Sequence, residues 1–170
     1  MRLAILLFTW LMVVHAAVFA AEPAAESDAQ KAVRYTAALE TNPFASDAKQ
    51  MRQWMMAWVT DTPDYTVYVC GDLFGPMMKK KHEDVPYGPE LLMQQMFGNV
   101  AYQIGNPGTH DEVSKQLAGM ESLLKVYALV VARDAKARMP YYDNLLAEQK
   151  KGSLKAYLTP IIEKKCAKKP

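Results

Sequence analysis

Four side chains of the kinds that bind soft metal ions lie close together near the middle of this 170-residue chain. A stretch of thirteen residues contains Cys70, Met77, Met78 and His82. Thiolate, thioether and imidazole groups suit Cu(I). The methionines do not form a dense M-x-M or M-x-x-M cluster, and most of the others fall on amphipathic patterns that are typical of core helices. Copper binding by Met77, Met78 and His82 is therefore an alternative, and we expect these methionines to pack in the core.

The second cysteine, Cys166, lies close to the C-terminus. Two cysteines in an exported protein most simply form one disulfide. We expect Cys70 and Cys166 to pair, which would also remove the thiolate from a metal site. The bond would close a loop of about 96 residues, and loop closure of that size is worth about 4–5 kcal/mol in the chain-entropy model.

Lysines follow Cys70 at a short distance and surround Cys166, so the disulfide would bring two basic groups together. We call these seven residues the lysine patch: Lys79, Lys80, Lys81, Lys164, Lys165, Lys168 and Lys169. Such a patch would attract an anionic partner, such as an acidic lipid headgroup, an envelope polymer or an acidic protein. A solvated lysine-rich end that keeps the protein soluble explains the same pattern. Both interpretations stay open.

Few of the residue patterns used in catalysis are present. The sequence contains no G-x-S-x-G elbow, P-loop, H-E-x-x-H motif or paired C-x-x-C. A cysteine nucleophile would need a histidine, and the chain after residue 20 offers only His82 and His110. His110 lies within "THDE", which we interpret as a capping box with Thr109 at the N-cap and Glu112 three residues later. We predict no catalytic residue and no cofactor, and an enzyme whose site the sequence does not disclose is a further alternative.

The N-terminal segment predicts export. One positive charge at Arg2 precedes a run of apolar residues, and Val18 and Ala20 are the small residues that signal peptidase requires. We expect residues 1–20 to be a signal peptide that is cleaved after Ala20, which places the protein in the periplasm or outside the cell. A membrane anchor is the alternative, although an apolar stretch of about 17 residues is at the lower limit for spanning a bilayer.

Composition after residue 20 limits the class of partner. The remaining chain has 19 basic and 18 acidic residues, because only Arg2 is removed with the signal peptide. This near-neutral balance argues against nucleic-acid binding. No second apolar stretch reaches the length of a transmembrane segment.

Hydrophobic periodicity predicts helices along most of the rest. Apolar residues recur every three or four positions from Ala29, after a Ser46 N-cap, after Gly88, after Thr109 through Ala135, after Pro140 and after Ser153. Only residues 65–88 fit neither a helix nor a strand cleanly. We therefore predict an all-α, single-domain bundle of five to six helices with short loops, one irregular central segment over residues 65–88 and one disulfide.

The predicted organisation is a signal peptide over residues 1–20, a flexible lead-in over 21–28 and a helical domain over 29–170. The predicted function is that of an exported, non-enzymatic protein that acts by binding a partner. The sequence does not identify that partner.

Overall fold

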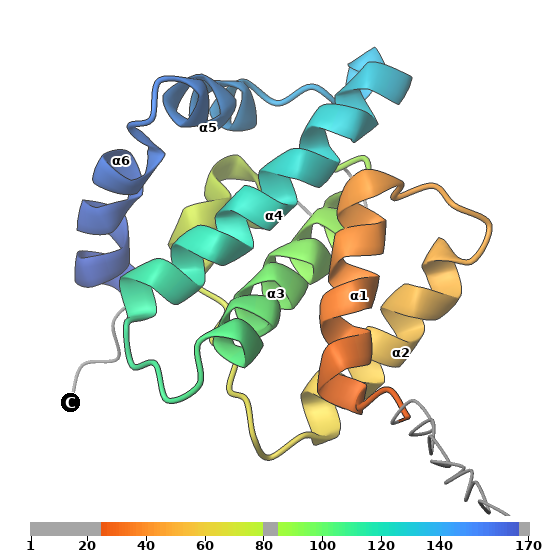
Figure 1. Cartoon of the computed structure of the whole chain (residues 1–170). Coiled ribbons are helices and arrows are strands. Elements are labelled where there is room, and N and C mark those ends of the chain that lie inside the picture. The colour runs from red at the N-terminus through yellow and green to blue at the C-terminus, as the bar shows by residue number, and fades with distance from the viewer. Residues whose placement is uncertain (1–24, 80–84, 167–170) are drawn as a thin grey trace, which may run out of the picture.

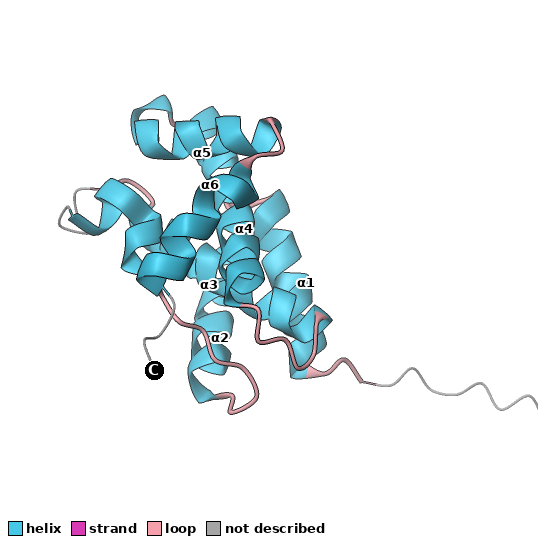
Figure 2. Cartoon of the chain, turned by 90° about the vertical axis from the view of Figure 1, so that its left-hand side faces the viewer, coloured by secondary structure: helices cyan, strands magenta, loops and turns pink. Residues whose placement is uncertain are grey.

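The computed structural model describes residues 25–79 and 85–166, and these residues form helices and loops without a strand (Figure 2). The α-helices are α1 (Asp28–Thr41), α2 (Ala48–Asp61), α3 (Gly88–Gly105), α4 (Glu112–Arg133), α5 (Pro140–Lys150) and α6 (Leu154–Ile161). The other helical segments are η1 (Gly71–Lys79), η3 (Ala135–Ala137) and the π-helical turn η4 (Ile162–Cys166). Six α-helices and one disulfide confirm the predicted all-α bundle within the described ranges.

Helices α3 and α4 form the centre of the molecule, with α1 and α2 on one side and α5 and α6 on the other (Figure 1). Two glycines allow the central helices to approach closely. A Cβ atom on Gly98 would lie 2.3 Å from Ser122 Cβ, and a Cβ on Gly119 would lie 2.6 Å from the Gln95 carbonyl oxygen. Any larger side chain at either position would therefore push the two helices apart.

Buried amides line the same interface. The Gln94 side chain donates to Ser122 Oγ at 2.8 Å, and the Gln95 side chain donates to Gln116 Oε1 at 2.9 Å. All four residues are buried. Because a buried polar group is costly without a partner, these pairs favour one register of α3 against α4.

Two groups of buried apolar residues flank the central helices. The C-terminal cluster joins η1, α4, α5, α6 and η4, and its largest members include Phe74, Met120, Leu124, Tyr127, Tyr142 and Leu158. The N-terminal cluster joins α1, α2 and α3 and consists of Ala32, Leu39, Ala48, Met51, Met55, Phe97 and Val100. The Met and Trp pattern of α2 divides between core and rim, because Met51 and Met55 are buried whereas Trp54 and Trp58 are partly exposed.

The irregular segment connects the two sides of the bundle. Residues 65–70 have no regular structure, and η1 follows with a break at Gly75, whose φ is 53°. A Cβ on Gly75 would lie 2.9 Å from the Tyr141 ring, so both the backbone conformation and the ring require glycine here. The Cys70–Cys166 disulfide then joins this segment to η4, as predicted from the sequence.

Three predicted helix starts are displaced. Thr109 is not the N-cap of α4. Asp111 is the N-cap and accepts from the Ser114 backbone N–H at 3.0 Å, while Thr109 Oγ1 accepts from the Asp111 N–H within the preceding turn. The N-cap of α2 is Asp47 rather than Ser46. Helix α1 begins at Asp28, one residue before the predicted start, because Ser27 and Gln30 form a capping box.

Candidate functional site

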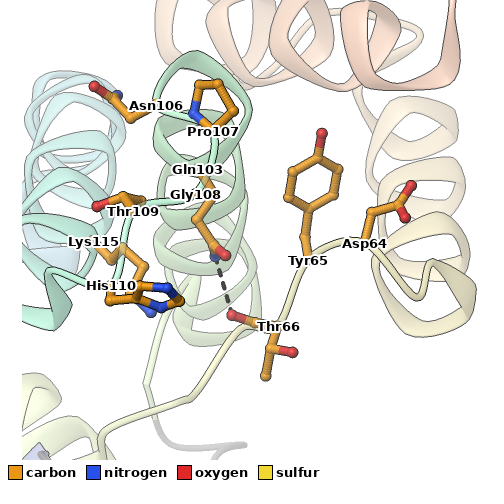
Figure 3. A pocket seen from close by; sticks show the side chains of 10 residues that line it. All are labelled: Asp64, Tyr65, Thr66, Gln103, Asn106, Pro107, Gly108, Thr109, His110 and Lys115. Carbon is orange, nitrogen blue, oxygen red and sulfur yellow. Dashed lines mark hydrogen bonds between the residues drawn. The ribbon is translucent and has the colours of Figure 1, made fainter.

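A cleft of about 450 Å³ lies between the segment that follows α2 and the turn that joins α3 to α4 (Figure 3). One wall consists of residues 64–66. The other wall and the floor come from the end of α3, the turn and the start of α4. The lining residues are Asp64, Tyr65, Thr66, Gln103, Asn106, Pro107, Gly108, Thr109, His110 and Lys115.

Side-chain amides from α3 and α4 hold the irregular wall in place. Gln103 Nε2 donates to the Thr66 carbonyl at 3.0 Å, the bond drawn in Figure 3, and Gln116 Nε2 donates to the Tyr68 carbonyl at 2.7 Å. The first amide also donates to Asn99 Oδ1 at 2.8 Å. Because residues 65–70 have no neighbouring strand, these amides replace ladder hydrogen bonds that a sheet would supply.

Local turn chemistry shapes the opposite wall. Asn106 ends α3 and its side chain donates to the Tyr102 carbonyl at 2.9 Å, while Gly108 adopts a φ of 76° that favours glycine. The Thr109 backbone N–H donates back to the Asn106 carbonyl. This compact turn places Thr109 and His110 beside the cleft, where Figure 3 shows them across from Tyr65.

Charges in the cleft are nearly balanced. Asp64 contributes a negative charge from one wall and Lys115 a positive charge from the other. The Lys115 ammonium also forms an ion pair at 2.7 Å with Glu112. Bonds from Ser114 lower the pKa of the nearby Asp111 carboxyl, which caps α4 instead of facing a ligand. The cleft therefore has no strong preference for an ion of either sign.

The polar groups of the cleft suit binding. Amide, hydroxyl, imidazole and phenol groups are present, and each can donate or accept a hydrogen bond. Within the described residues, no hydrogen bond links His110 to a hydroxyl or a carboxylate that would activate it as a base. The arrangement is a polar cleft with one aromatic wall.

A row of aromatic rings continues from the cleft along α2. Tyr65 packs against Trp58, Trp58 stacks on Trp54 with centroids 5.8 Å apart, and Trp54 meets Tyr35 edge-on at 5.4 Å. The Lys31 ammonium lies 4.1 Å from the centre of the Trp54 ring. The row holds Tyr65 in position against the N-terminal cluster.

The lysine patch is described only in part. Lys164 and Lys165 lie exposed on η4, next to the disulfide that was expected to unite the patch. Lys80 and Lys81, Lys168 and Lys169, and the side chain of Lys79 lie outside the described residues. The patch and its anionic partner stay a prediction.

The structure describes the residues of the copper alternative only in part. Met77 is buried in the core as expected, and its sulfur accepts from the Tyr142 hydroxyl at 3.6 Å. Met78 is exposed, so the expectation that it packs in the core is wrong. Cys70 is committed to the disulfide, and His82 lies outside the described residues. Among the residues searched, His, Cys, Asp and Glu form no group of three that could hold a metal ion. The copper alternative is not carried further.

Sequence reasoning missed the cleft. It recognised Gly105 to Gly108 as a turn and assigned His110 to a capping box, but gave neither a binding role. The usable signal was the polar residues of two stretches between predicted helices, "TPDYT" and "GNPGTH". Nothing in either stretch shows that the two lie close together in the folded chain.

Comparisons with protein-family models, with curated proteins and with solved structures gave no match to this chain. In the described ranges, none of the helices combines the length and the apolar character needed to cross a bilayer. The functional argument therefore rests on the geometry of the chain itself.

Proposed function

We propose that this chain is an exported, non-enzymatic binding protein whose cleft holds a neutral, hydroxyl-rich ligand such as a saccharide unit. The observation that carries the proposal is the combination of one aromatic ring with several amide and hydroxyl groups in a cleft of about 450 Å³ without excess charge. Small-ligand sites combine apolar or aromatic walls with a few convergent polar groups.

The chemistry of a sugar ring fits these walls. One face of the ring presents C–H groups that can stack on an aromatic side chain such as Tyr65, and its hydroxyls both donate and accept. Asn106, Thr109 and His110 supply complementary groups on the other wall. The balance between Asp64 and Lys115 favours a neutral ligand over an ion.

Export is part of the proposal and rests on the pattern of residues 1–20. The disulfide is compatible with it, since such bonds persist in oxidising compartments. An apolar ligand or a protein partner would use a different surface. Binding of sugars at the cleft therefore separates the proposal from these alternatives.

Titration of the disulfide-intact chain from residue 21 with glucose, N-acetylglucosamine and maltose tests the cleft. In two-dimensional amide NMR, we expect shifts confined to residues 64–66 and 103–115. Tyr65→Leu should weaken binding about two- to tenfold, since aromatic stacking is worth about 0.5–1.5 kcal/mol.

Tyr68→Leu is the matched control, because Tyr68 belongs to the same segment, is exposed and does not line the cleft. This variant should bind like the wild type. Shifts that are absent at high sugar concentration, or that lie away from the cleft, would contradict the proposal.

A further inference from the structure

A second pocket, of about 340 Å³, lies where η1, the residues before α3 and the linker from η3 to α5 come together. It shares no lining residue with the cleft at Tyr65. Its lining combines apolar residues with Lys136 and Arg138, and none of the described residues that line it is acidic. We call this space the linker pocket.

The wall that carries the two cations is held in place by a buried phenol. Tyr127 is buried, and its hydroxyl accepts from the Met139 backbone N–H at 2.8 Å and donates to Asp143 Oδ1 at 2.9 Å. The Asp134 side chain caps η3 by accepting from the Lys136 N–H at 3.0 Å. The backbone of this linker is therefore fixed before any ligand arrives.

Two further phenols tie the opposite wall to α5. The Tyr141 hydroxyl donates to the Leu73 carbonyl at 3.0 Å, and the Tyr142 hydroxyl donates to the Phe74 carbonyl at 3.4 Å. Both carbonyls belong to η1. Because the two walls are joined to each other through α5, the linker pocket is preformed, as small-molecule sites usually are.

The apolar surface of the pocket can be reached from solvent. Pro76, Pro86 and Pro140 are exposed, and Met139 and Tyr141 are partly exposed. A proline ring loses no side-chain entropy when a ligand covers it, and a methionine adapts its shape to a neighbour. This surface therefore suits a compact apolar group.

The two cations border this apolar surface. The Lys136 side chain is exposed and forms no ion pair with another described residue. The exposed Arg138 donates from Nη1 to Asp143 Oδ2 at 3.1 Å and keeps donors on its other nitrogens. Asp143 offsets one of the two cations, so one net positive charge remains. No side chain caps α5, which begins at Pro140, so the positive end of its dipole adds to that charge.

We propose that the linker pocket binds a small monocarboxylate with an apolar body. The carboxylate accepts from Lys136 and Arg138, and the apolar body lies against Met139 and Tyr141. A neutral apolar ligand gains nothing from the cations, and the charge of a dianion exceeds that of the site. This site is separate from the cleft at Tyr65 and does not depend on the saccharide proposal.

3-Phenylpropanoate and 3-phenylpropanamide are the probes, because they share the apolar body and differ in charge. In NMR titrations of the disulfide-intact protein at low salt, the acid should bind about three- to tenfold more tightly than the amide, as expected for exposed charge-assisted bonds. This preference should shrink as salt is added. Shifts should be confined to η1, residues 85–86 and residues 136–141.

Charge variants test the cations. Lys136→Gln combined with Arg138→Gln should remove the preference for the acid and leave the affinity of the amide unchanged. Lys136→Gln alone, which breaks no described side-chain bond, should lower the preference at least about twofold, so the test holds even if the double variant is unstable. Lys150→Gln is the matched control, since Lys150 is an exposed lysine at the end of α5 and does not line the pocket.

Met139→Ala tests the apolar wall. This variant should weaken both probes by a similar factor of about two- to fivefold, because it removes apolar contact that the acid and the amide share.

Equal affinities of the acid and the amide at low salt would overturn the proposal, as would a preference for the acid that survives in the double variant. Absence of binding by the acid, or shifts in another part of the chain, would also overturn it. Wild-type affinities in Met139→Ala would contradict the placement of the apolar body.

Discussion

The N-terminal and C-terminal clusters are stabilised in different ways. The C-terminal cluster is closed by the Cys70–Cys166 disulfide, and its buried tyrosines bond to the protein itself: Tyr127 to Asp143 and Met139, and Tyr142 to Phe74. The N-terminal cluster is smaller, with no cross-link among its described residues, and is bordered by partly exposed rings.

The cleft borders the less constrained cluster, because Tyr65 packs against its rim. The cross-linked side of the bundle is therefore the more constrained support, and the proposed saccharide site lies on the other side.

Loss of the disulfide should have the largest effect on this contrast. Replacing both Cys70 and Cys166 with Ala removes a cross-link between residues 96 positions apart. We expect a loss of about 4–5 kcal/mol in the free energy of unfolding, measured by urea denaturation. Hydrogen exchange should accelerate more in η1 and α6 than in α1 and α2. A loss below about 1 kcal/mol, or equal acceleration on both sides, would contradict the assignment of the disulfide to one cluster.

Enlarging Gly98 should affect both clusters together, because α3 and α4 are common to them. A Cβ at this position would also lie 2.9 Å from the Ala118 carbonyl oxygen, so Gly98→Ala must separate the helices. We expect a loss of about 1–3 kcal/mol in urea denaturation, in spite of the better helix propensity of alanine.

Gly105→Ala is the control for this variant. Gly105 is also in α3, and nothing lies within 4 Å of the position that its Cβ would occupy. Stability should stay the same or rise. If the two variants behaved alike, the close approach of α3 and α4 would not limit stability.

Alkaline pH should destabilise the C-terminal cluster before the N-terminal cluster. We expect this to be the smallest of the three effects on stability. Burial, reinforced by the charges of Tyr157 and Asp72, raises the pKa of Tyr141 to about 12, and burial raises that of Tyr142 as well. An unfolded tyrosine titrates near pH 10, so this stabilisation is complete below about pH 10 and is lost as the pH rises towards 12.

The urea midpoint between pH 9 and 11 measures this effect. Tyr141→Phe keeps the ring against Gly75 and removes the hydroxyl that donates to the Leu73 carbonyl. The variant should start less stable near pH 8 and fall less steeply with pH than the wild type. Identical slopes would show that Tyr141 does not ionise on unfolding in this range.

Local patterns predicted much of the fold. Apolar spacing gave the helices, Gly88-Pro89 gave the start of α3, Gly152 gave the end of α5, and the two cysteines gave the disulfide. The N-caps were predicted less well than the helices, since "THDE" contains two good N-cap residues. Asp111 is the N-cap of α4, because the Thr109 side chain bonds within its own turn.

The sequence by itself determined the helical class, most helix ranges and the cross-link, because these depend on side-chain spacing along one helix or on the count of cysteines. Only the tertiary structure decided where the candidate sites lie. Gln103 meets Thr66 across 37 positions, and Tyr141 meets Leu73 across 68 positions. Such contacts come from helix packing rather than local propensity, so no short stretch of sequence records them.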